Sequence, residues 1–562
     1  MSRPDAIIIG AGAGGAAIAW RLTQHKLNVL LIEAGPRYEP TKDYRLNTPR
    51  WELERFPFKP DTQGKHSFDV NVPLTPQWDH LHSWNAVAGR LNRSGQRTVA
   101  DAGYHHVRGI GGSTLHYTGE SHRLHPDSMK LFSQFGVGAD WPLSYADLEP
   151  YYVQAEKLVG VAGPIDTGVR WRSEPYPLPA HPLCKASQTI TDAANALGIK
   201  WVENSRAALS RPYDGRPSCN YCGNCGYGCP IGDKGSADVT FIRHALASGH
   251  CTILSDTSVT HIISNPTGHI TGVETTDKQK GKARYQAPII ILASGAVETP
   301  RLLLNSATPT FNKGLANSHG QVGRHFMDTL SWVSTGMLDK SIDSFKGLPA
   351  DAICWDYNAP NGIPNVVGGC RLTSSTQEIG LTGSVNYARR IVSGFGASLK
   401  QNIRNSLGHA LSISGIAEML PNEETYIQLD PNRHDALGLP LALIRSRLTE
   451  DDYKRLSFMA EKTRNILMAA GAKTLVEEFS TYDHFSSTHV FGSCRMGENT
   501  KSSVVNSYGR THDCENLYLA DASVFPSTGG GEAPSLTIFA LALRTADHIA
   551  GNHLKETAGT QL

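Results

Sequence analysis

Apolar runs at the start of the chain flank a segment of helical composition. Residues 6–9 form a short β-branched run, which is typical of a buried parallel strand. Residues 16–23 have helical composition, and residues 28–32 supply a second strand-like run. The order strand, helix, strand predicts a βαβ unit at the N-terminus.

Further elements are predicted along the rest of the chain. Residues 289–304 read as a strand, a glycine turn and a helix with Pro300 in its first turn. Two more strand-like runs lie at 332–338 and 425–429. A helical pattern with an acidic start covers 449–470, and a last helix begins at 536. We see no internal repeat or low-complexity tract.

Glycines follow the first strand-like run at once, in the order Gly10-Ala-Gly12-Ala-Gly-Gly15. In a dinucleotide-binding βαβ unit Gly10 makes the tight turn, Gly12 lets the backbone approach a pyrophosphate, and Gly15 permits close helix–strand packing. Glu33 ends the second run, where a carboxylate accepts hydrogen bonds from ribose hydroxyls. These residues predict dinucleotide binding and disfavour NADP, but they leave FAD and NAD open.

Three more regions of the chain contain sequence motifs. They are RGIGGST at 108–114, IIILASGAVETPRLLL at 289–304, and the C-terminal pair STHVFGSCRMG at 487–497 and NLYLADASVFP at 516–526. With the N-terminal unit, these motifs resemble the glucose–methanol–choline (GMC) oxidoreductases, FAD enzymes that oxidise alcohols and sugars. The resemblance runs from residue 5 to residue 550 and is closest to the large subunits of bacterial gluconate, sorbitol and glucose dehydrogenases.

The resemblance implies an α/β (α+β) fold, in which a Rossmann-like FAD-binding domain assembled from separated segments joins a substrate domain on a mixed or antiparallel sheet. The FAD-binding domain would comprise residues 1–40, 100–160, 235–330 and 486–562. The substrate domain would comprise 41–99, 161–234 and 331–485, with a cysteine-rich insert at 219–229. Stretches rich in proline and charge, around 40–80 and 159–182, are expected to run over the surface.

The resemblance also implies the catalytic residue. Alcohol oxidation needs a base for the hydroxyl proton, and a neutral histidine suits that task because its pKa lies near working pH. In the family this histidine belongs to the C-terminal HxxG-type segment, which places it at His489. A second polar residue, histidine or asparagine, usually stands where this chain has Ala533, so Glu532 or a residue of the substrate domain would replace it, or His489 would act alone.

The motifs also supply the expected FAD-binding residues. These are Gly10, Gly12, Gly15, Glu33, Gly111, Gly112, Ser113, His116, Thr118, Gly295, Asp521 and Ala522. Some relatives link FAD covalently through a histidine at the position of His116, whereas others bind it without a bond. Asp521 ends a strand-like run, and we expect it near the ribityl or pyrophosphate groups.

Four of the ten cysteines lie within eleven residues. The spacing Cys219-x2-Cys222-x2-Cys225-x3-Cys229-Pro matches that of bacterial ferredoxins, and it predicts an iron–sulfur cluster with these cysteines as the metal ligands. Three of them would hold a 3Fe-4S cluster, and Cys229 would complete the ligands of a 4Fe-4S cluster. Disulfides, zinc and free thiols are the alternatives. A cluster would favour a dehydrogenase that passes single electrons to a partner such as cytochrome c or quinone.

Composition and the pattern of the first residues bear on binding partners, membrane insertion and cellular location. Lysine and arginine total 53 against 52 acidic residues, a net charge of +1 that argues against nucleic-acid binding. No apolar run approaches the roughly 18–20 residues of a membrane span. The first residues lack a cleavable signal pattern, so we expect a cytoplasmic protein, or a periplasmic one if it is exported with a signal-bearing subunit.

The sequence therefore predicts an FAD-dependent dehydrogenase of a sugar or polyol. Its electrons would pass through an iron–sulfur cluster to a partner acceptor, and a small chaperone-like subunit would accompany it. Two alternatives remain at this stage: an oxygen-using sugar or alcohol oxidase with structural cysteines, and a non-catalytic flavin-binding subunit, which the alanine at 533 suggests.

Overall fold

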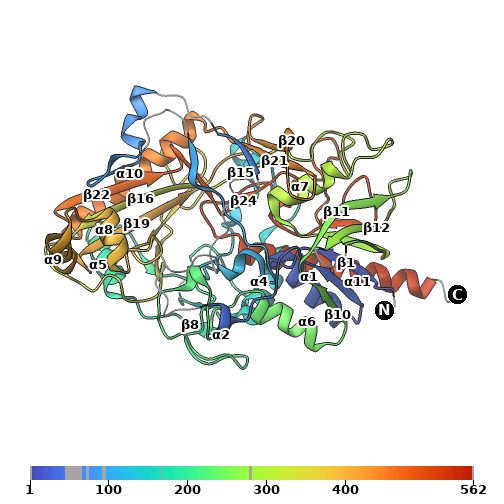
Figure 1. The fold of residues 1–562 in the computed structure, drawn as a ribbon, viewed down its shortest axis with the longest axis horizontal. Coiled ribbons are helices and arrows are strands. Elements are labelled where there is room, and N and C mark those ends of the chain that lie inside the picture. Colours follow the sequence, from blue (N-terminus) through green and yellow to red (C-terminus); the bar gives the residue numbers. More distant parts are fainter. Residues whose placement is uncertain are drawn as a thin grey trace.

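The computed structural model describes residues 3–44, 66–70, 75–91, 97–165, 168–277 and 281–559 (Figure 1). Two large sheets, each with its own apolar core, lie toward opposite ends of the elongated molecule. The helices are α1 (Ala13–Gln24), α2 (Pro40–Asp43), α3 (Leu131–Phe135), α4 (Tyr145–Val159), α5 (Lys185–Ala196), α6 (Arg243–Ala247), α7 (Gly295–Asn305), α8 (Ser384–Arg390), α9 (Gly396–Ser406), α10 (Glu450–Ala469) and α11 (Ser535–Gly559).

The first sheet is parallel and draws its strands from distant parts of the chain. Its order is β10-β2-β1-β14-β25, and every neighbouring pair is parallel. These strands are Cys251–Leu254, Val29–Ile32, Ala6–Ile9, Ile289–Leu292 and Leu517–Leu519. Strands β1 and β2 are buried along their whole length, as expected of a parallel sheet covered on both faces.

Small residues bring helices close to this sheet. Helix α1 contacts α11, and α11 in turn contacts α4. A Cβ on Gly14 would lie 1.5 Å from the Ala520 carbonyl oxygen, and one on Gly15 would lie 1.8 Å from the Gly10 carbonyl oxygen. Only glycine therefore fits at the start of α1, where the helix meets the ends of the strands.

The second sheet has eight strands in the order β5-β4-β22-β16-β19-β18-β17-β9, and its neighbouring pairs are antiparallel. The strands in this order are Gly89–Arg90, Trp84–Asn85, Thr474–Ser480, Leu330–Met337, Ala410–Ala417, Cys370–Ser374, Ala352–Cys354 and Val202–Glu203. Helix α10 crosses β16 and β19. A Cβ on Gly415 of β19 would lie 2.6 Å from the Met459 sulfur, so this glycine sets how closely the helix approaches.

Smaller sheets complete the fold. One has the order β11-β12-β13 (Thr257–Ser264, Ile270–Asp277, Gly281–Tyr285), and another has the order β20-β21-β3 (Tyr426–His434, Pro440–Arg445, His66–Asp69). The two-stranded pairs are β15 with β24 (Met327–Asp328, Val490–Phe491), β23 with β6 (His484–Ser487, Thr98–Tyr104), and β7 with β8 (Ala162–Gly163, Leu178–Pro179).

The predicted fold class is confirmed, and the predicted elements differ from the observed ones mainly at their ends. The pattern at 332–338 forms β16, and the pattern at 449–470 forms α10. Thr449 caps that helix instead of joining it, because its hydroxyl accepts the Asp452 amide in a capping box. Among the described residues, no helix is both long and apolar enough to cross a membrane. The division into two domains stays a prediction.

Candidate active site

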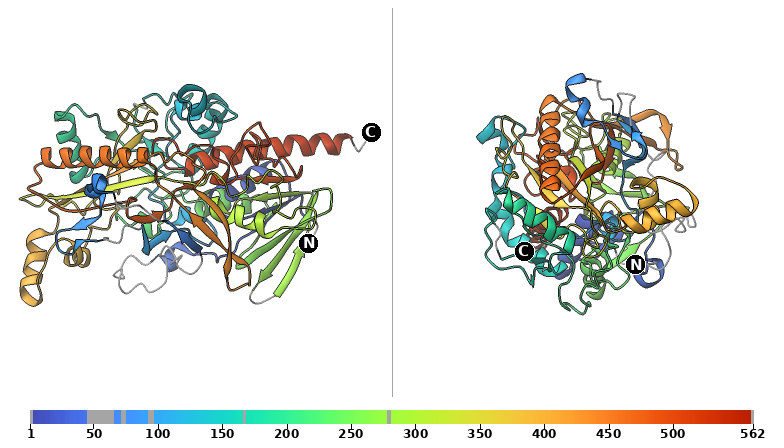
Figure 2. Two further views of the ribbon diagram at one scale, coloured as in Figure 1. Left: turned by 90° about the horizontal axis from the view of Figure 1, so that it is seen from above. Right: turned by 90° about the vertical axis from the view of Figure 1, so that its left-hand side faces the viewer.

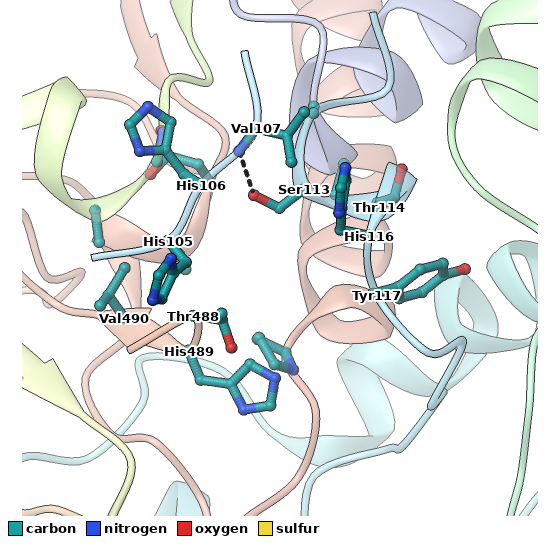
Figure 3. A pocket seen from close by; sticks show the side chains of 18 of the residues that line it. His105, His106, Val107, Ser113, Thr114, His116, Tyr117, Thr488, His489 and Val490 are labelled. Atoms are coloured by element: carbon teal, nitrogen blue, oxygen red, sulfur yellow. Dashed lines mark hydrogen bonds between the residues drawn. The ribbon is translucent and has the colours of Figure 1, made fainter. Parts of the chain in front are cut away.

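A cavity of about 880 Å³ extends from the parallel sheet to the eight-stranded sheet. Figure 3 shows part of its wall, with His105, Thr488 and His489 on one side and the segment Ser113–Tyr117 on the other. Of the predicted site residues, the cavity brings together Gly10, Gly12, Glu33, Gly112, Ser113, His116, Thr118, Gly295, Asp521, Ala522 and His489. Gly15 and Gly111 lie outside the lining and act on its shape through packing.

The glycine motif forms the wall next to the parallel sheet. Gly10 has φ +99°, and a Cβ there would lie 2.5 Å from the Ala293 carbonyl oxygen, so the turn after β1 requires glycine. Gly12 caps the N-terminus of α1, and a Cβ there would meet only the Gly112 Cα, at 3.8 Å. Bare backbone at a helix N-terminus suits the approach of a phosphate group.

Glu33 is buried at the end of β2 and accepts hydrogen bonds from backbone amides. Its Oε2 accepts the Ala11 amide at 2.9 Å, and its Oε1 accepts the Gly35 and Gly109 amides at 2.9 and 3.1 Å. Burial raises the pKa of Glu33, an effect that the three amides oppose. The carboxylate therefore holds three loops of the cavity wall together, and a ribose hydroxyl would be an additional partner.

Asp521 plays a similar part on the other side of β14. Its Oδ2 accepts the Gly295 amide at 3.0 Å and the Thr299 hydroxyl at 2.6 Å, and its Oδ1 accepts the Ser523 amide at 2.8 Å. This carboxylate thereby ties the start of α7 to the turn that contains Ala522. The predicted pair Gly295 and Asp521 is in direct contact.

The segment 108–118 passes close to the glycine motif. Gly111 has φ +108°, and a Cβ on Gly112 would lie 2.6 Å from the Gly12 Cα. Ser113 accepts the Val107 amide through its hydroxyl at 3.3 Å, and the Thr118 hydroxyl lies 3.4 Å from Glu378. The two glycine-rich segments therefore touch where neither has a side chain.

His116 connects the cavity wall to the cysteine-rich segment. Its Nδ1 lies 3.0 Å from the Gly226 carbonyl oxygen, which only accepts, so Nδ1 carries the proton. The buried Lys234 ammonium donates to the carbonyls of Leu115, Tyr117 and Cys225 at 2.8–3.0 Å. Segments 113–118 and 225–227 are therefore held against each other.

His489 lies in the cavity wall on the loop between β23 and β24. Strand β24 pairs with β15, which aligns Val490 with Asp328. The Ser487 hydroxyl donates to the Asp328 carboxyl group. The loop is therefore attached to β15 on both sides of His489.

The region around Ala533 shows whether Glu532 takes the place of the polar residue expected at position 533. Ala533 lines the cavity, and its amide donates to His122 Nδ1 at 3.0 Å. Glu532 is buried outside the lining, where its Oε1 accepts the His125 amide at 2.9 Å and pairs with Arg170 at 2.7 Å. Glu532 therefore does not present its carboxylate to the cavity next to His489.

Side chains of the eight-stranded sheet form the opposite wall, and sequence analysis did not identify them. Ser331, Arg371, Thr373 and Ser414 line the cavity from β16, β18 and β19, together with Glu120 from the segment that follows Thr118. The segment 331–485 is expected to supply substrate-domain residues, but it carries no motif that identifies these four as site residues. Their shared surface becomes visible only when the register of three strands is known.

The charges on this wall compensate each other. Arg371 Nη2 lies 2.7 Å from Glu120 Oε2, its Nε donates to the Gly531 carbonyl at 2.6 Å, and its Nη1 donates to the Thr373 hydroxyl at 3.2 Å. Burial opposes ionisation of Glu120, but the Arg371 guanidinium brings the pKa of this carboxyl below its ordinary value. The pair therefore presents polar groups without net charge.

The four clustered cysteines do not form a metal site among the described residues. Cys225 is buried, Cys219 and Cys229 are half-buried, and Cys222 is exposed, all with free thiols. The Cys229 thiol donates to Asp233 at 2.7 Å, and burial raises the pKa of this thiol to about 12. Within the ranges that the structure describes, no group of three histidine, cysteine or acidic side chains is placed to hold a metal ion, so the predicted iron–sulfur cluster is not supported.

FAD, in contrast, suits the cavity. The lining combines backbone without side chains at Gly10 and Gly12 with carboxylates at Glu33 and Asp521, and it continues to the polar wall. Two family models described as GMC oxidoreductase match residues 5–330 and 421–542. The chain belongs to the GMC oxidoreductases. The predicted family and its FAD cofactor are thus confirmed.

Known proteins similar to this GMC oxidoreductase include dehydrogenases and oxidases. It is 30% identical to the fructose dehydrogenase large subunit of Gluconobacter japonicus, with 98% of each chain covered. It is 28% identical to 6'''-hydroxyparomomycin C oxidase of Streptomyces lividus, with 98% of this chain and 91% of the relative covered. A crystal structure of formate oxidase shares the fold, with a TM-score of 0.66 at 15% identity over 99% of both chains.

Proposed function

We propose that this protein is an FAD-dependent dehydrogenase that oxidises a hydroxyl group of a neutral sugar or polyol to a carbonyl. The observation that carries this proposal is the polar, charge-compensated wall of Ser331, Arg371, Thr373 and Ser414 that faces the flavin-binding part of the cavity. Hydroxyls and a charge-paired guanidinium on such a wall match a neutral substrate that carries several hydroxyls. Similarity to a fructose dehydrogenase large subunit supports the same substrate class.

His489 acts as the base in this proposal. It lines the same cavity as the glycine motif, and its loop is attached to β15 through Ser487 and Asp328. A neutral imidazole takes the hydroxyl proton of the substrate while the C–H bond breaks, a contribution of roughly 10²–10⁴ in rate. FAD, when bound, supplies the acceptor for the two electrons of that bond.

Other residues hold the cofactor and the substrate. Gly10 and Gly12 accommodate the pyrophosphate, Glu33 and Asp521 shape the wall around ribose and ribityl hydroxyls, and Ala522 and Gly295 lie beside Asp521. Position 533 has no polar side chain, but Arg371 and Glu120 form an ionisable pair that lines the same cavity. They orient hydroxyls and do not take the proton.

A covalent bond between FAD and His116 is a separate proposal. The Nδ1–H group of His116 is directed at the Gly226 carbonyl, which leaves Nε2 with the lone pair that such a bond needs. Acid precipitation of the protein tests whether FAD is covalently bound. Flavin that stays in the pellet supports the bond, and flavin released to the supernatant contradicts it.

We also propose that electrons leave to a separate acceptor protein or quinone. The relative in Gluconobacter japonicus is named a large subunit, which supports a complex with a further subunit. A small chaperone-like subunit and a cytochrome c or quinone acceptor are the partners that we propose. An iron–sulfur cluster at Cys219, Cys222, Cys225 and Cys229 stays a prediction of their spacing alone. Iron and acid-labile sulfide analysis of the purified protein decides it.

An anaerobic absorption spectrum tests the main proposal. Neutral polyols, ketoses, aldoses and the corresponding aldonic acids are added one at a time to the oxidised flavoprotein. Bleaching of the flavin bands by a neutral polyhydroxy compound is the expected result. Bleaching only by aldonic acids or by simple monohydric alcohols would contradict the proposed substrate class.

Oxygen use is the second candidate, because the Streptomyces lividus relative is named an oxidase. Stoichiometric peroxide formation in air, at the rate of substrate oxidation, would favour it. Turnover that needs an added electron acceptor would favour the dehydrogenase.

A further inference from the structure

Helices α8 and α9 form a hairpin, residues 381–407, which we call the basic hairpin. The two helices contact each other and lie at the end of the molecule opposite the C-terminus (Figure 1). In the left view of Figure 2, α9 stands out from the body of the protein. Helix α9 contains no buried residue, and Ile403 and Leu407 lie partly buried against the core that includes Tyr387.

The basic hairpin concentrates positive charge in a chain whose net charge is only +1. No aspartate or glutamate occurs between Glu378 and Glu418, and four cations do: Arg389, Arg390, Lys400 and Arg404. Arg390 turns inward and pairs with Glu477. The other three are exposed, so they form a local cationic surface.

An aromatic side chain falls between these cations along the chain. Phe395 joins the two helices, and its exposed fraction of 87% is the highest of any phenylalanine in the described ranges. The connection has a defined shape: the Ser398 hydroxyl donates to the Phe395 carbonyl at 2.8 Å, and the Asn402 amide donates to the Ser393 carbonyl at 3.0 Å. Removing a phenylalanine side chain from water is favourable, and the described part of the chain does not cover Phe395.

We propose that the basic hairpin docks the protein on an anionic lipid bilayer, with Phe395 in the headgroup region and Arg389, Lys400 and Arg404 against the lipid phosphates. Basic residues beside an apolar side chain on an exposed helix are typical of such contacts. A protein partner of ordinary affinity covers roughly 800 Å² of each surface. A projecting tip with one aromatic side chain offers less surface than that, so it fits the headgroup region of a bilayer better than the surface of a folded protein.

Vesicle flotation of the FAD-loaded full-length protein tests the proposal. Phosphatidylcholine vesicles are compared with vesicles that contain phosphatidylglycerol, each at low and high salt. We expect binding only to the anionic vesicles, with a loss of about tenfold at high salt. The F395S variant and the triple variant Arg389→Gln, Lys400→Gln, Arg404→Gln should each lose at least tenfold in binding.

Matched controls carry equivalent changes elsewhere on the surface. Phe132→Ser removes another exposed phenylalanine, and Arg211→Gln, Lys313→Gln, Lys501→Gln together remove three other exposed cations. Both controls should bind as the wild type does. Wild-type protein that ignores anionic vesicles would overturn the proposal. So would a full retention of binding by F395S beside its loss in the triple variant, the pattern expected of a purely electrostatic contact such as that with an acidic protein.

Discussion

The two walls of the cavity recognise their ligands by different means. Next to the parallel sheet, the wall is backbone: Gly10 and Gly12 leave it bare, and Glu33 fastens its loops through three amides. Next to the eight-stranded sheet, the wall consists of side chains such as Arg371 and Ser414. The first wall fits a cofactor shared by a whole family, and the second can vary without altering the backbone.

This difference predicts how each wall responds to substitution. A backbone wall fails when a side chain is added, because a Cβ meets fixed atoms. A side-chain wall fails when a group is removed or its charge is altered, while the fold and the cofactor remain. Three substitutions test the comparison, from the largest expected effect to the smallest, and a fourth tests the pH dependence of stability.

His489→Ala should reduce the rate of anaerobic flavin reduction by roughly 10²–10⁴ and leave FAD content unchanged, because it removes the proposed base and no backbone contact. Stopped-flow measurement with the best substrate provides the rate. His319→Ala, which alters an exposed histidine, is the control and should match the wild type. Unchanged flavin reduction in His489→Ala would contradict the assignment of the base.

Gly14→Ala should destabilise the protein by about 3 kcal/mol, because the added Cβ would lie 1.5 Å from the Ala520 carbonyl oxygen. Gly12→Ala is the matched variant, since its Cβ would meet only the Gly112 Cα at 3.8 Å. It should fold normally and bind FAD weakly. Denaturant unfolding and flavin content measure the two effects, and equal destabilisation by both variants would contradict the comparison.

Glu120→Gln should alter substrate preference by roughly tenfold, or about 1.4 kcal/mol. It leaves the Arg371 guanidinium without its compensating charge, so kcat/KM for an aldonic acid should rise relative to that for the neutral sugar. Glu298→Gln changes a cavity carboxylate that pairs with Arg301 instead, and it should leave the ratio unaltered. A ratio that is the same in both variants would show that Arg371 does not face the substrate.

Glu418→Gln tests a buried carboxyl group that directly follows β19 and lies outside the cavity lining. Glu418 is fully buried, and burial raises its pKa to about 8, an effect that Glu532 adds to and Arg455 opposes. The folded protein therefore binds a proton here that the unfolded chain releases above about pH 4.5. Stability should fall as pH rises from about 4.5 to 8, by up to about 1.4 kcal/mol per pH unit.

The glutamine variant should lack this contribution, so its stability should vary less over that range. Urea unfolding at pH 5, 6, 7 and 8 measures the difference between the two proteins. A difference that is constant with pH would show that Glu418 is ionised in the folded state.

The sequence predicts the backbone wall of the cavity much better than the side-chain wall. Gly10, Gly12 and Glu33 belong to one continuous βαβ unit, residues 6–33, whose geometry fixes where each of them falls, so the sequence locates them. Arg371 and Glu120 meet across a distance of many residues in the chain, and only the register of β18 and β19 brings Arg371 to the cavity. The cysteine spacing indicated a cluster, but spacing alone does not fix the direction of a thiol, and Cys222 is exposed.

The order of strands in the parallel sheet has a consequence for synthesis of the chain. Strand β1 emerges from the ribosome first, yet it pairs with β14, and the edge strand β25 ends at Leu519. At roughly 5–20 residues per second, β14 follows β1 after about 15 seconds to one minute, and β25 follows after about half a minute to two minutes. Its apolar strands remain accessible to chaperones during that time. Because the parallel sheet is complete only after β25 has been synthesised, we expect FAD to bind after that point.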